Sequence, residues 1–269
     1  MNNKQKGHNF KQLFYYMFVR KRIKLKYLFS NKINNKFLFI LSPPYCGSTL
    51  LNSLISTSKY VSSNNEIGTR EGQTLPEVRH IMFGKERWNK DVEYSWDFIK
   101  KNWMKYWDQT KPILLEKSTT NIIRVQSIKK TFQNSYFICI VRNPYAQVEG
   151  IMRRNNASAE YAANFSIKCL EYQKYNIETE KNLIFFTYED LCDNTKQVAS
   201  EIINFLPEIN KLNINTLFKA HNFKTKNKMA IKNLNKEKIK KISKKDLAII
   251  NKIFQKNIEL LKYFNYNII

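Results

Sequence analysis

The 269-residue chain carries a formal net charge of +24 at neutral pH, from 46 lysine and arginine residues against 22 acidic ones. Apolar residues make up 43% of the sequence and aromatic residues 14%, which is enough material for a hydrophobic core and excludes an intrinsically disordered chain. The sequence has no apolar run near the length of about 20 residues that crosses a bilayer, and residues 1–10 lack the features of a secretory signal. We therefore expect a cytoplasmic protein.

Most of the excess positive charge lies in two segments. Residues 1–36 contain ten lysine or arginine residues and no acid, and residues 222–245 contain ten lysines and one acid, Glu237. Lysine is far more abundant than arginine, and asparagine and isoleucine are frequent, a bias that an A+T-rich genome produces without any anionic partner. A basic surface for an anionic partner is the alternative. Charge alone does not indicate nucleic acid, and we expect no nucleic-acid partner.

The cysteines and histidines show no pattern of a metal site or a disulfide framework. Cys46, Cys139, Cys169 and Cys192 have no CxxC spacing, and the three histidines stand apart from one another. The sequence predicts free thiols in a reducing compartment and no bound metal.

Five short apolar runs, separated by segments of helical length, predict the strands of one sheet: residues 37–41, 60–62, 113–115, 136–141 and 183–187. Such near-continuous apolar strands alternating with helices are typical of a parallel sheet covered on both faces. Helices are expected over residues 49–56, 145–154, 189–205 and 245–261. The predicted fold class is α/β, a P-loop-like three-layer fold with a central parallel sheet of about five strands.

The chain divides into a basic N-terminal extension, residues 1–35, and a single domain, residues 36–269. Within the domain, the lysine-rich segment of about residues 221–245 is interpreted as a loop. Residues 10–28 alternate aromatic and basic side chains, so they form either an amphipathic helix on an anionic membrane surface or a helix packed on the domain. Residues 88–107 are rich in aromatics that either stack on the sugar rings of an acceptor or fill the core, and we favour the core.

The segment after the first strand has the composition of a phosphate-binding loop. It reads Pro43-Pro-Tyr-Cys-Gly-Ser-Thr49 and leads directly into the predicted helix. Glycine allows backbone N–H groups to approach an oxyanion, two hydroxyls add donors, and the helix N-terminus adds a positive dipole. The lysine of a Walker A loop is absent, which argues against ATP. A plain helix cap at Ser48 is the alternative interpretation.

A second segment makes the set of motifs more specific. The strand 136–141 is followed by Arg142-Asn-Pro144 and a predicted helix. Together with the loop, this segment resembles the enzymes that transfer sulfate from 3′-phosphoadenosine 5′-phosphosulfate (PAPS), in which a strand-end arginine binds the 3′-phosphate. Residues 65–76, 115–118 and 188–191 resemble further segments of that family, in the same order, closest to its tyrosylprotein and bacterial glycan branch.

The resemblance implies a sulfotransferase that moves a sulfuryl group from PAPS to a hydroxyl on a glycan or a tyrosine-like acceptor. It implies donor contacts from two groups of residues: Tyr45, Cys46, Gly47, Ser48, Thr49 and Leu50 near the sulfate, and Arg142, Gly150 and Arg154 near the 3′-phosphate. It also implies that Lys117 faces the transferred group and that a carboxylate is the general base. Glu71 and Glu116 both match catalytic glutamates of different branches, and the loop position favours Glu71.

Two positions depart from the family pattern. Tyr45 stands where many members carry lysine or arginine, and Gly150 stands where a serine normally joins the arginine on the 3′-phosphate. The backbone N–H, Ser158, Arg153 or Arg154 could replace that serine. Lys224, Lys226 and Lys228 either close over the nucleotide or belong to a plain solvated run of charge. Two rival functions follow from these departures and from the loop: a nucleotide-dependent kinase of P-loop fold, or a catalytically weak anion-binding relative.

Overall fold

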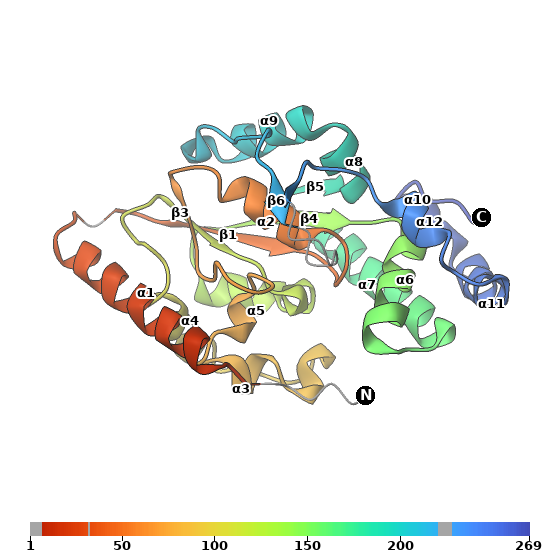
Figure 1. Cartoon of the computed structure of the whole chain (residues 1–269), viewed down its shortest axis with the longest axis horizontal. Helices are drawn as coiled ribbons and strands as arrows, with labels where there is room; N and C mark the ends of the chain where they lie inside the picture. The colour runs from red at the N-terminus through yellow and green to blue at the C-terminus, as the bar shows by residue number, and fades with distance from the viewer. Residues whose placement is uncertain (1–6, 32, 220–227) are drawn as a thin grey trace.

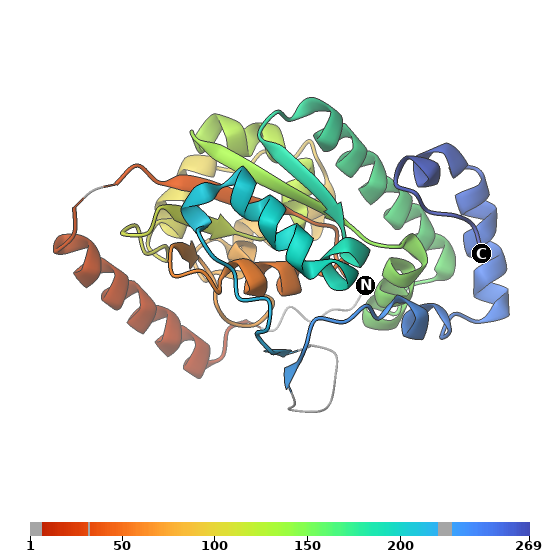
Figure 2. The same cartoon turned by 90° about the horizontal axis from the view of Figure 1, so that it is seen from above.

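The computed structural model describes residues 7–31, 33–219 and 228–269, and its centre is a five-stranded parallel sheet (Figures 1 and 2). The strand order is β2-β3-β1-β4-β5, which places β1 in the middle. The strands are β1 (Lys36–Leu41), β2 (Val61–Ser63), β3 (Ile113–Glu116), β4 (Ser135–Val141) and β5 (Leu183–Thr187). The α/β fold and all five predicted strands are confirmed, each to within one residue.

Helices cover both faces of the sheet because β1 is apolar on both sides. Leu38 and Ile40 pack toward one face, whereas Phe37, Phe39 and Leu41 pack toward the other. The first face is covered by α2 (Ser48–Ile55), α8 (Tyr188–Asp193) and α9 (Thr195–Phe205). The second face is covered by α4 (Trp96–Trp103), α5 (Val125–Thr131) and α7 (Ala159–Thr179).

The remaining elements lie around the edges of the sheet and at the C-terminal end of the chain. The helix α6 (Pro144–Asn155) follows β4 and packs against α7 and α11. The others are α3 (Arg79–Met82), α10 (Asn235–Ile239), α11 (Lys244–Gln255), α12 (Ile258–Tyr263), the 3₁₀ turns η1 (Gly72–Thr74), η2 (Lys85–Trp88), η3 (Thr119–Ile123) and η4 (Pro207–Ile209), and the antiparallel pair β6 (Phe218–Lys219) and β7 (Lys228–Met229).

Two of the expected helices are each divided in two. The segment 189–205 breaks between α8 and α9 at Asn194, and the segment 245–261 breaks between α11 and α12 near Asn257. Both asparagines have ψ angles of 30° to 39°, outside the helical range. The asparagine side chain competes for backbone hydrogen bonds and so favours helix ends. The apolar periodicity of the sequence does not reveal this effect.

The N-terminal helix α1 (Phe10–Leu28) has the predicted bounds and packs on the domain. It buries Tyr16 and Ile23, and its Arg20 and Lys26 form ion pairs with Glu77 (2.6 Å) and Asp108 (2.9 Å). Among the described residues, no helix is both long and apolar enough to cross a membrane.

The aromatic segment 88–107 contributes to the core rather than to an open face. Trp103 and Trp107 are fully buried and pack against Phe132. Their indole nitrogens donate hydrogen bonds to the carbonyl oxygens of Gly72 (3.2 Å) and Leu115 (2.9 Å), as buried indoles require. The core interpretation of this segment is therefore confirmed for these two tryptophans.

Candidate active site

The β1–α2 loop, residues 42–47, lies at the carboxyl edge of the sheet and ends at a helix N-terminus. Gly47 has φ of +90°, in the left-handed region, and a Cβ atom there would lie 2.5 Å from the ring of Tyr188. Only glycine fits this position, and it turns the chain into α2. Burial raises the pKa of Cys46 to about 12, so its thiol stays neutral and adds no negative charge to the loop. The groups available to an anion here are the backbone N–H groups and the hydroxyls of Ser48 and Thr49.

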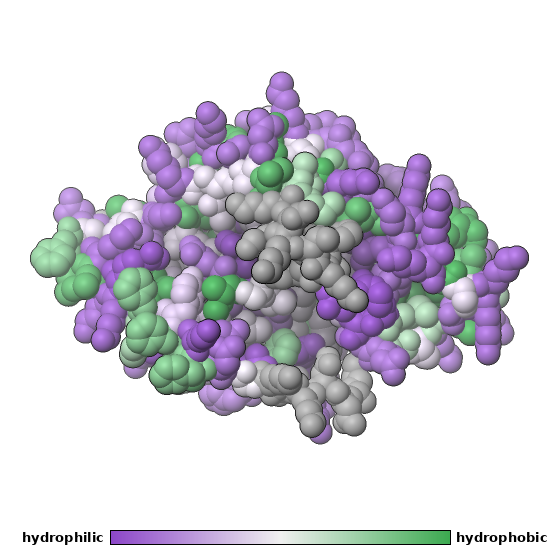
Figure 3. All heavy atoms as spheres, viewed as in Figure 1, coloured by the Kyte–Doolittle hydropathy of each residue, from purple (hydrophilic) through white to green (hydrophobic). Residues whose placement is uncertain are grey.

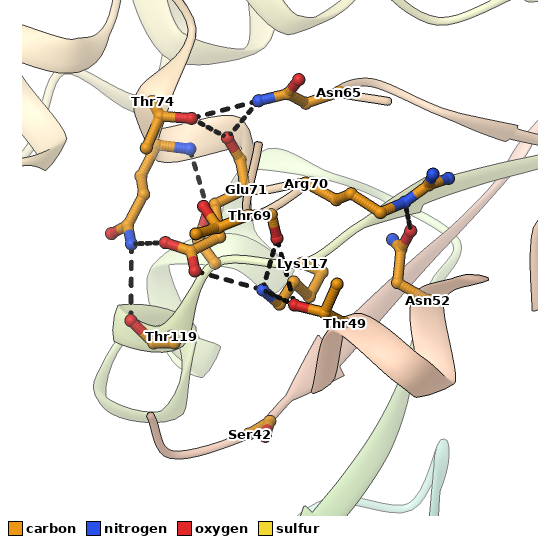
Figure 4. Close-up of polar contacts among 12 residues, drawn as sticks. Ser42, Thr49, Asn52, Asn65, Thr69, Arg70, Glu71, Thr74, Lys117 and Thr119 are labelled. Carbon is orange, nitrogen blue, oxygen red and sulfur yellow. Dashed lines mark hydrogen bonds and ion pairs between the residues drawn. The ribbon is translucent and has the colours of Figure 1, made fainter. Parts of the chain in front are cut away.

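Lys117 connects this loop to the segment after β2 (Figure 4). The side chain is 2% exposed, and its ammonium group donates to Thr49 Oγ1 (3.2 Å), Thr69 O (2.7 Å) and Glu71 Oε1 (3.1 Å). Gln73 donates to the other carboxylate oxygen of Glu71. The predicted residues Thr49, Glu71 and Lys117 thus form one hydrogen-bonded cluster, although Glu71 and Lys117 are 46 residues apart in sequence.

Glu116, the other candidate base, has no exposed surface and has its carboxylate oxygens occupied. Oε1 accepts from Gly72 N (2.9 Å) and Ser118 Oγ (2.6 Å), and Oε2 accepts from Asn121. Burial raises the pKa of Glu116 to about 7, while these donors lower it. The side chain therefore holds the turn that carries Glu71, because Gly72 directly follows Glu71.

Arg142 lies on the other side of the loop, at the end of β4. Its Nη1 donates to Tyr45 O (3.1 Å), its Nε donates to Asn235 Oδ1 (2.7 Å), and its guanidinium lies 3.8 Å from the centre of the Tyr188 ring. Its buried Nη2 atom has no hydrogen-bond partner among the described residues. A buried guanidinium nitrogen without a partner is unfavourable unless it binds something, so this atom indicates an anion site.

The segment 188–191 holds Arg142 and the loop in place. The Tyr188 ring contacts both Gly47 and Arg142. Glu189 accepts from the backbone N–H of Asn143 (3.0 Å), from Asn235 and from the hydroxyl of Tyr266 (3.0 Å). The late motif that resembles the sulfotransferase pattern is thereby part of the site.

The two positions that depart from the family pattern touch each other. A Cβ atom on Gly150 would lie 2.9 Å from Tyr45 Cβ and Cγ and 3.4 Å from Lys238 Nζ. The Tyr45 hydroxyl donates to Asn155 Oδ1 (3.0 Å), at the C-terminal end of α6. Burial raises the pKa of Tyr45, which keeps the phenol neutral beside the cations of Arg154 and Arg153.

The other candidates have different surroundings. Ser158 caps α7 by accepting from Tyr161 N, Arg153 pairs with Glu149 (2.5 Å), and Leu50 packs partly buried in the core on the α2 side of the sheet. Lys224 and Lys226 lie outside the described residues. Among the described residues, no group of three or more histidine, cysteine, aspartate or glutamate side chains is placed to hold a metal ion.

Sequence analysis missed Lys238, Asn235 and Arg87. Lys238 and Asn235 come from α10, within the segment interpreted as a loop. Burial lowers the pKa of Arg87, on η2, and the Glu71 carboxylate is close enough for its charge to raise that pKa. No local pattern distinguishes Lys238 from the other lysines around it. The one indication in the sequence is its spacing of three residues from Asn235, which places both side chains on one face of a helix.

Comparisons with known proteins agree with this geometry. The family model described as "Sulfotransferase family" matches residues 38–208, well over half of the chain and all five strands. No curated protein sequence is significantly similar to this chain. Among solved structures, the sulfotransferase domain from the curacin biosynthetic pathway has a TM-score of 0.52 at 17% identity and covers 89% of this chain and 100% of its own.

Two further solved structures are similar in fold. A sulfotransferase from Alicyclobacillus acidocaldarius has a TM-score of 0.53 at 10% identity, covering 86% of this chain and 96% of its own. One from Mycobacterium avium has a TM-score of 0.52 at 11% identity, covering 93% of this chain and 82% of its own. At these identities the structures show the fold, and the family model adds the family. This chain belongs to the sulfotransferase family.

Proposed function

We propose that this chain transfers a sulfuryl group from PAPS to a hydroxyl acceptor, either a glycan or a tyrosine-like group. The proposal is carried by one observation: two groups of residues suited to bind anions lie next to each other and share the β1–α2 loop. The β1–α2 loop and Lys117 form one element, and Arg142 forms the other, joined to the loop by its hydrogen bond to Tyr45 O.

The residues present fit this donor. The loop, the N-terminus of α2 and Lys117 suit the 5′-phosphosulfate, and the unpartnered Nη2 of Arg142 suits a separate 3′-phosphate. ATP carries no 3′-phosphate, and the loop lacks the Walker A lysine. The kinase alternative therefore leaves Arg142 without a role.

Glu71 is the general base in this proposal. As the acceptor oxygen bonds to sulfur, its proton passes to the Glu71 carboxylate, and the bond between sulfur and the bridging oxygen breaks to release adenosine 3′,5′-bisphosphate. Lys117, 3.1 Å from Glu71, stabilises negative charge on the transferred group and on the leaving oxygen. Glu116 is a positioning residue, because its oxygens already accept three hydrogen bonds that hold the following turn.

A transfer assay tests this assignment. With sulfate-labelled PAPS and a panel of glycans, tyrosine peptides and lipids, Glu71→Gln is expected to lower the transfer rate about 100-fold or more, because a positioned base contributes about 10²–10⁴. The same variant is expected to keep its affinity for adenosine 3′,5′-bisphosphate. The control is Glu66→Gln, which removes an exposed acid nearby. Unchanged transfer by Glu71→Gln would show that another group takes the proton.

We also propose that α1 contacts an anionic membrane surface. Opposite its packed face, α1 exposes large apolar side chains, and Figure 3 shows hydrophobic residues among hydrophilic ones at the edge of the molecule where α1 lies. The exposed apolar residues are Phe10, Leu13, Phe14, Met17, Phe18, Leu25 and Leu28. Exposed Lys21, Arg22 and Lys24 stand among them, so the exposed side of α1 mixes apolar side chains with cations that anionic lipid headgroups attract.

A further inference from the structure

We propose that Lys238 is a ligand of the donor's 3′-phosphate in this chain, in the space that a serine side chain fills where the family pattern holds. The inference rests on the proposed donor and adds to it a residue from α10, far from the known motifs in sequence. It also explains why the two departures, Tyr45 and Gly150, occur together.

The geometry at Gly150 carries the first step. A side chain at this position would meet the Tyr45 ring at 2.9 Å and the Lys238 ammonium group at 3.4 Å. A serine could not keep Tyr45 where it is, since contacts under 3.0 Å to ring atoms require the ring to move, whereas 3.4 Å to Lys238 Nζ is an ordinary van der Waals contact. Glycine at position 150 therefore admits the Tyr45 ring, and the neighbouring lysine supplies a cation on the same side of the loop as Arg142.

The second step is the anchoring of α10. Asn235 accepts a hydrogen bond from Arg142 Nε (2.7 Å) and donates one to Glu189, so the helix is tied to the strand-end arginine. Lys238 follows Asn235 by three residues, which places both side chains on the same face of the helix. On this face of α10, Asn235 positions Arg142 by a hydrogen bond, and Lys238 places its ammonium group beside Arg142.

The third step is the charge around Lys238. Its side chain is 11% exposed, and its recorded ion pair is with Glu149 at 3.7 Å, longer than a hydrogen bond. Glu149 is also held by Arg153 at 2.5 Å, so one carboxylate faces two cations, with Arg142 as a third nearby. Burial and the charge of Arg142 lower the pKa of Lys238 to about 8, and Cys46 is a further titratable neighbour. A phosphate dianion among these cations would relieve their repulsion.

Calorimetry with two nucleotides tests the inference. Adenosine 3′,5′-bisphosphate carries the 3′-phosphate, and adenosine 5′-monophosphate lacks it. Lys238→Met is expected to weaken bisphosphate binding about 10- to 100-fold, the range for a hydrogen bond to a charged group, and to leave monophosphate binding within about twofold. Lys238→Arg, which keeps the charge, is expected to retain most of the affinity. Lys240→Met, an exposed lysine just beyond α10, is the matched control.

The outcomes separate this inference from the proposed donor. If the wild-type protein fails to bind the bisphosphate, the donor proposal fails, and this inference fails with it. If the wild type binds the bisphosphate and Lys238→Met binds it equally well, only the role of Lys238 is overturned. Equal loss of affinity for both nucleotides would also overturn it. A residue whose replacement weakens binding whether or not the 3′-phosphate is present supports the shape of the loop and does not bind that phosphate. Thermal unfolding of each variant confirms that it is folded.

Discussion

Glu71 and Glu116 lie at the two ends of one hydrogen-bonded network, yet their surroundings give them different roles. Glu71 pairs with Lys117 beside the β1–α2 loop, whereas Glu116 has no exposed surface and holds Gly72 and Ser118. Resemblance placed both glutamates in the site, and the loop position of Glu71 favoured it without excluding Glu116. The hydrogen-bond partners that the two glutamates find in other segments of the chain favour Glu71 as the base. A sequence motif does not show these partners.

Glu116 makes the stability of the protein depend on pH. Its folded pKa of about 7 lies above the usual glutamate value of 4.5, so the folded state keeps a proton that the unfolded state releases between these values. The stabilisation that Glu116 gives the folded state through this proton is fully present below about pH 4.5 and is lost as the pH rises to about 7. Relative to Glu116→Gln, the wild-type free energy of unfolding should fall by about 3 kcal/mol over this range. Urea unfolding at several pH values measures it, and a constant difference between the two proteins would contradict the assignment.

At the scale of elements, the strands and their order along the chain were predictable because buried parallel strands are short apolar runs. The breaks at Asn194 and Asn257 were not, because a polar residue in a helical pattern does not by itself end a helix. The role of α10 was also hidden. Lys238 is one of ten lysines in residues 222–245, and its contact at Gly150 is set by tertiary packing.

The helix α1 allows a test of the membrane proposal at the same scale. Phe14 and Phe18 are 59% and 57% exposed, and replacing both with serine should lower binding to vesicles containing phosphatidylserine at least about tenfold, since each buried aromatic contributes about 1.5–3 kcal/mol. Cosedimentation measures the bound fraction. Replacing the exposed Tyr161 and Tyr175 of α7 with serine is the control and should change nothing. Wild-type protein that stays in the supernatant with these vesicles would contradict the proposal.

At the scale of the whole molecule, the charge of +24 is a poor guide to function, because it counts every lysine equally. The cations that define the candidate site are few and buried: Lys117, Arg142 and Lys238 are between 2% and 11% exposed. They surround one loop at the carboxyl edge of the sheet. Burial and position at this edge together distinguish these three, since Arg124 is as buried as Arg142 but donates to backbone carbonyl oxygens of residues 89–92. Both properties become visible only when the chain is folded.

The central claim is that this site recognises a nucleotide with separate 5′ and 3′ phosphates, and calorimetry tests it most directly. The wild-type protein should bind adenosine 3′,5′-bisphosphate more tightly than ATP with magnesium. Arg142→Ala should lose at least about 100-fold in that affinity, because it removes a buried charged partner of the 3′-phosphate. Arg20→Ala, which removes an arginine of α1, should bind normally. Preference for ATP with magnesium, or unchanged bisphosphate binding in Arg142→Ala, would contradict the account.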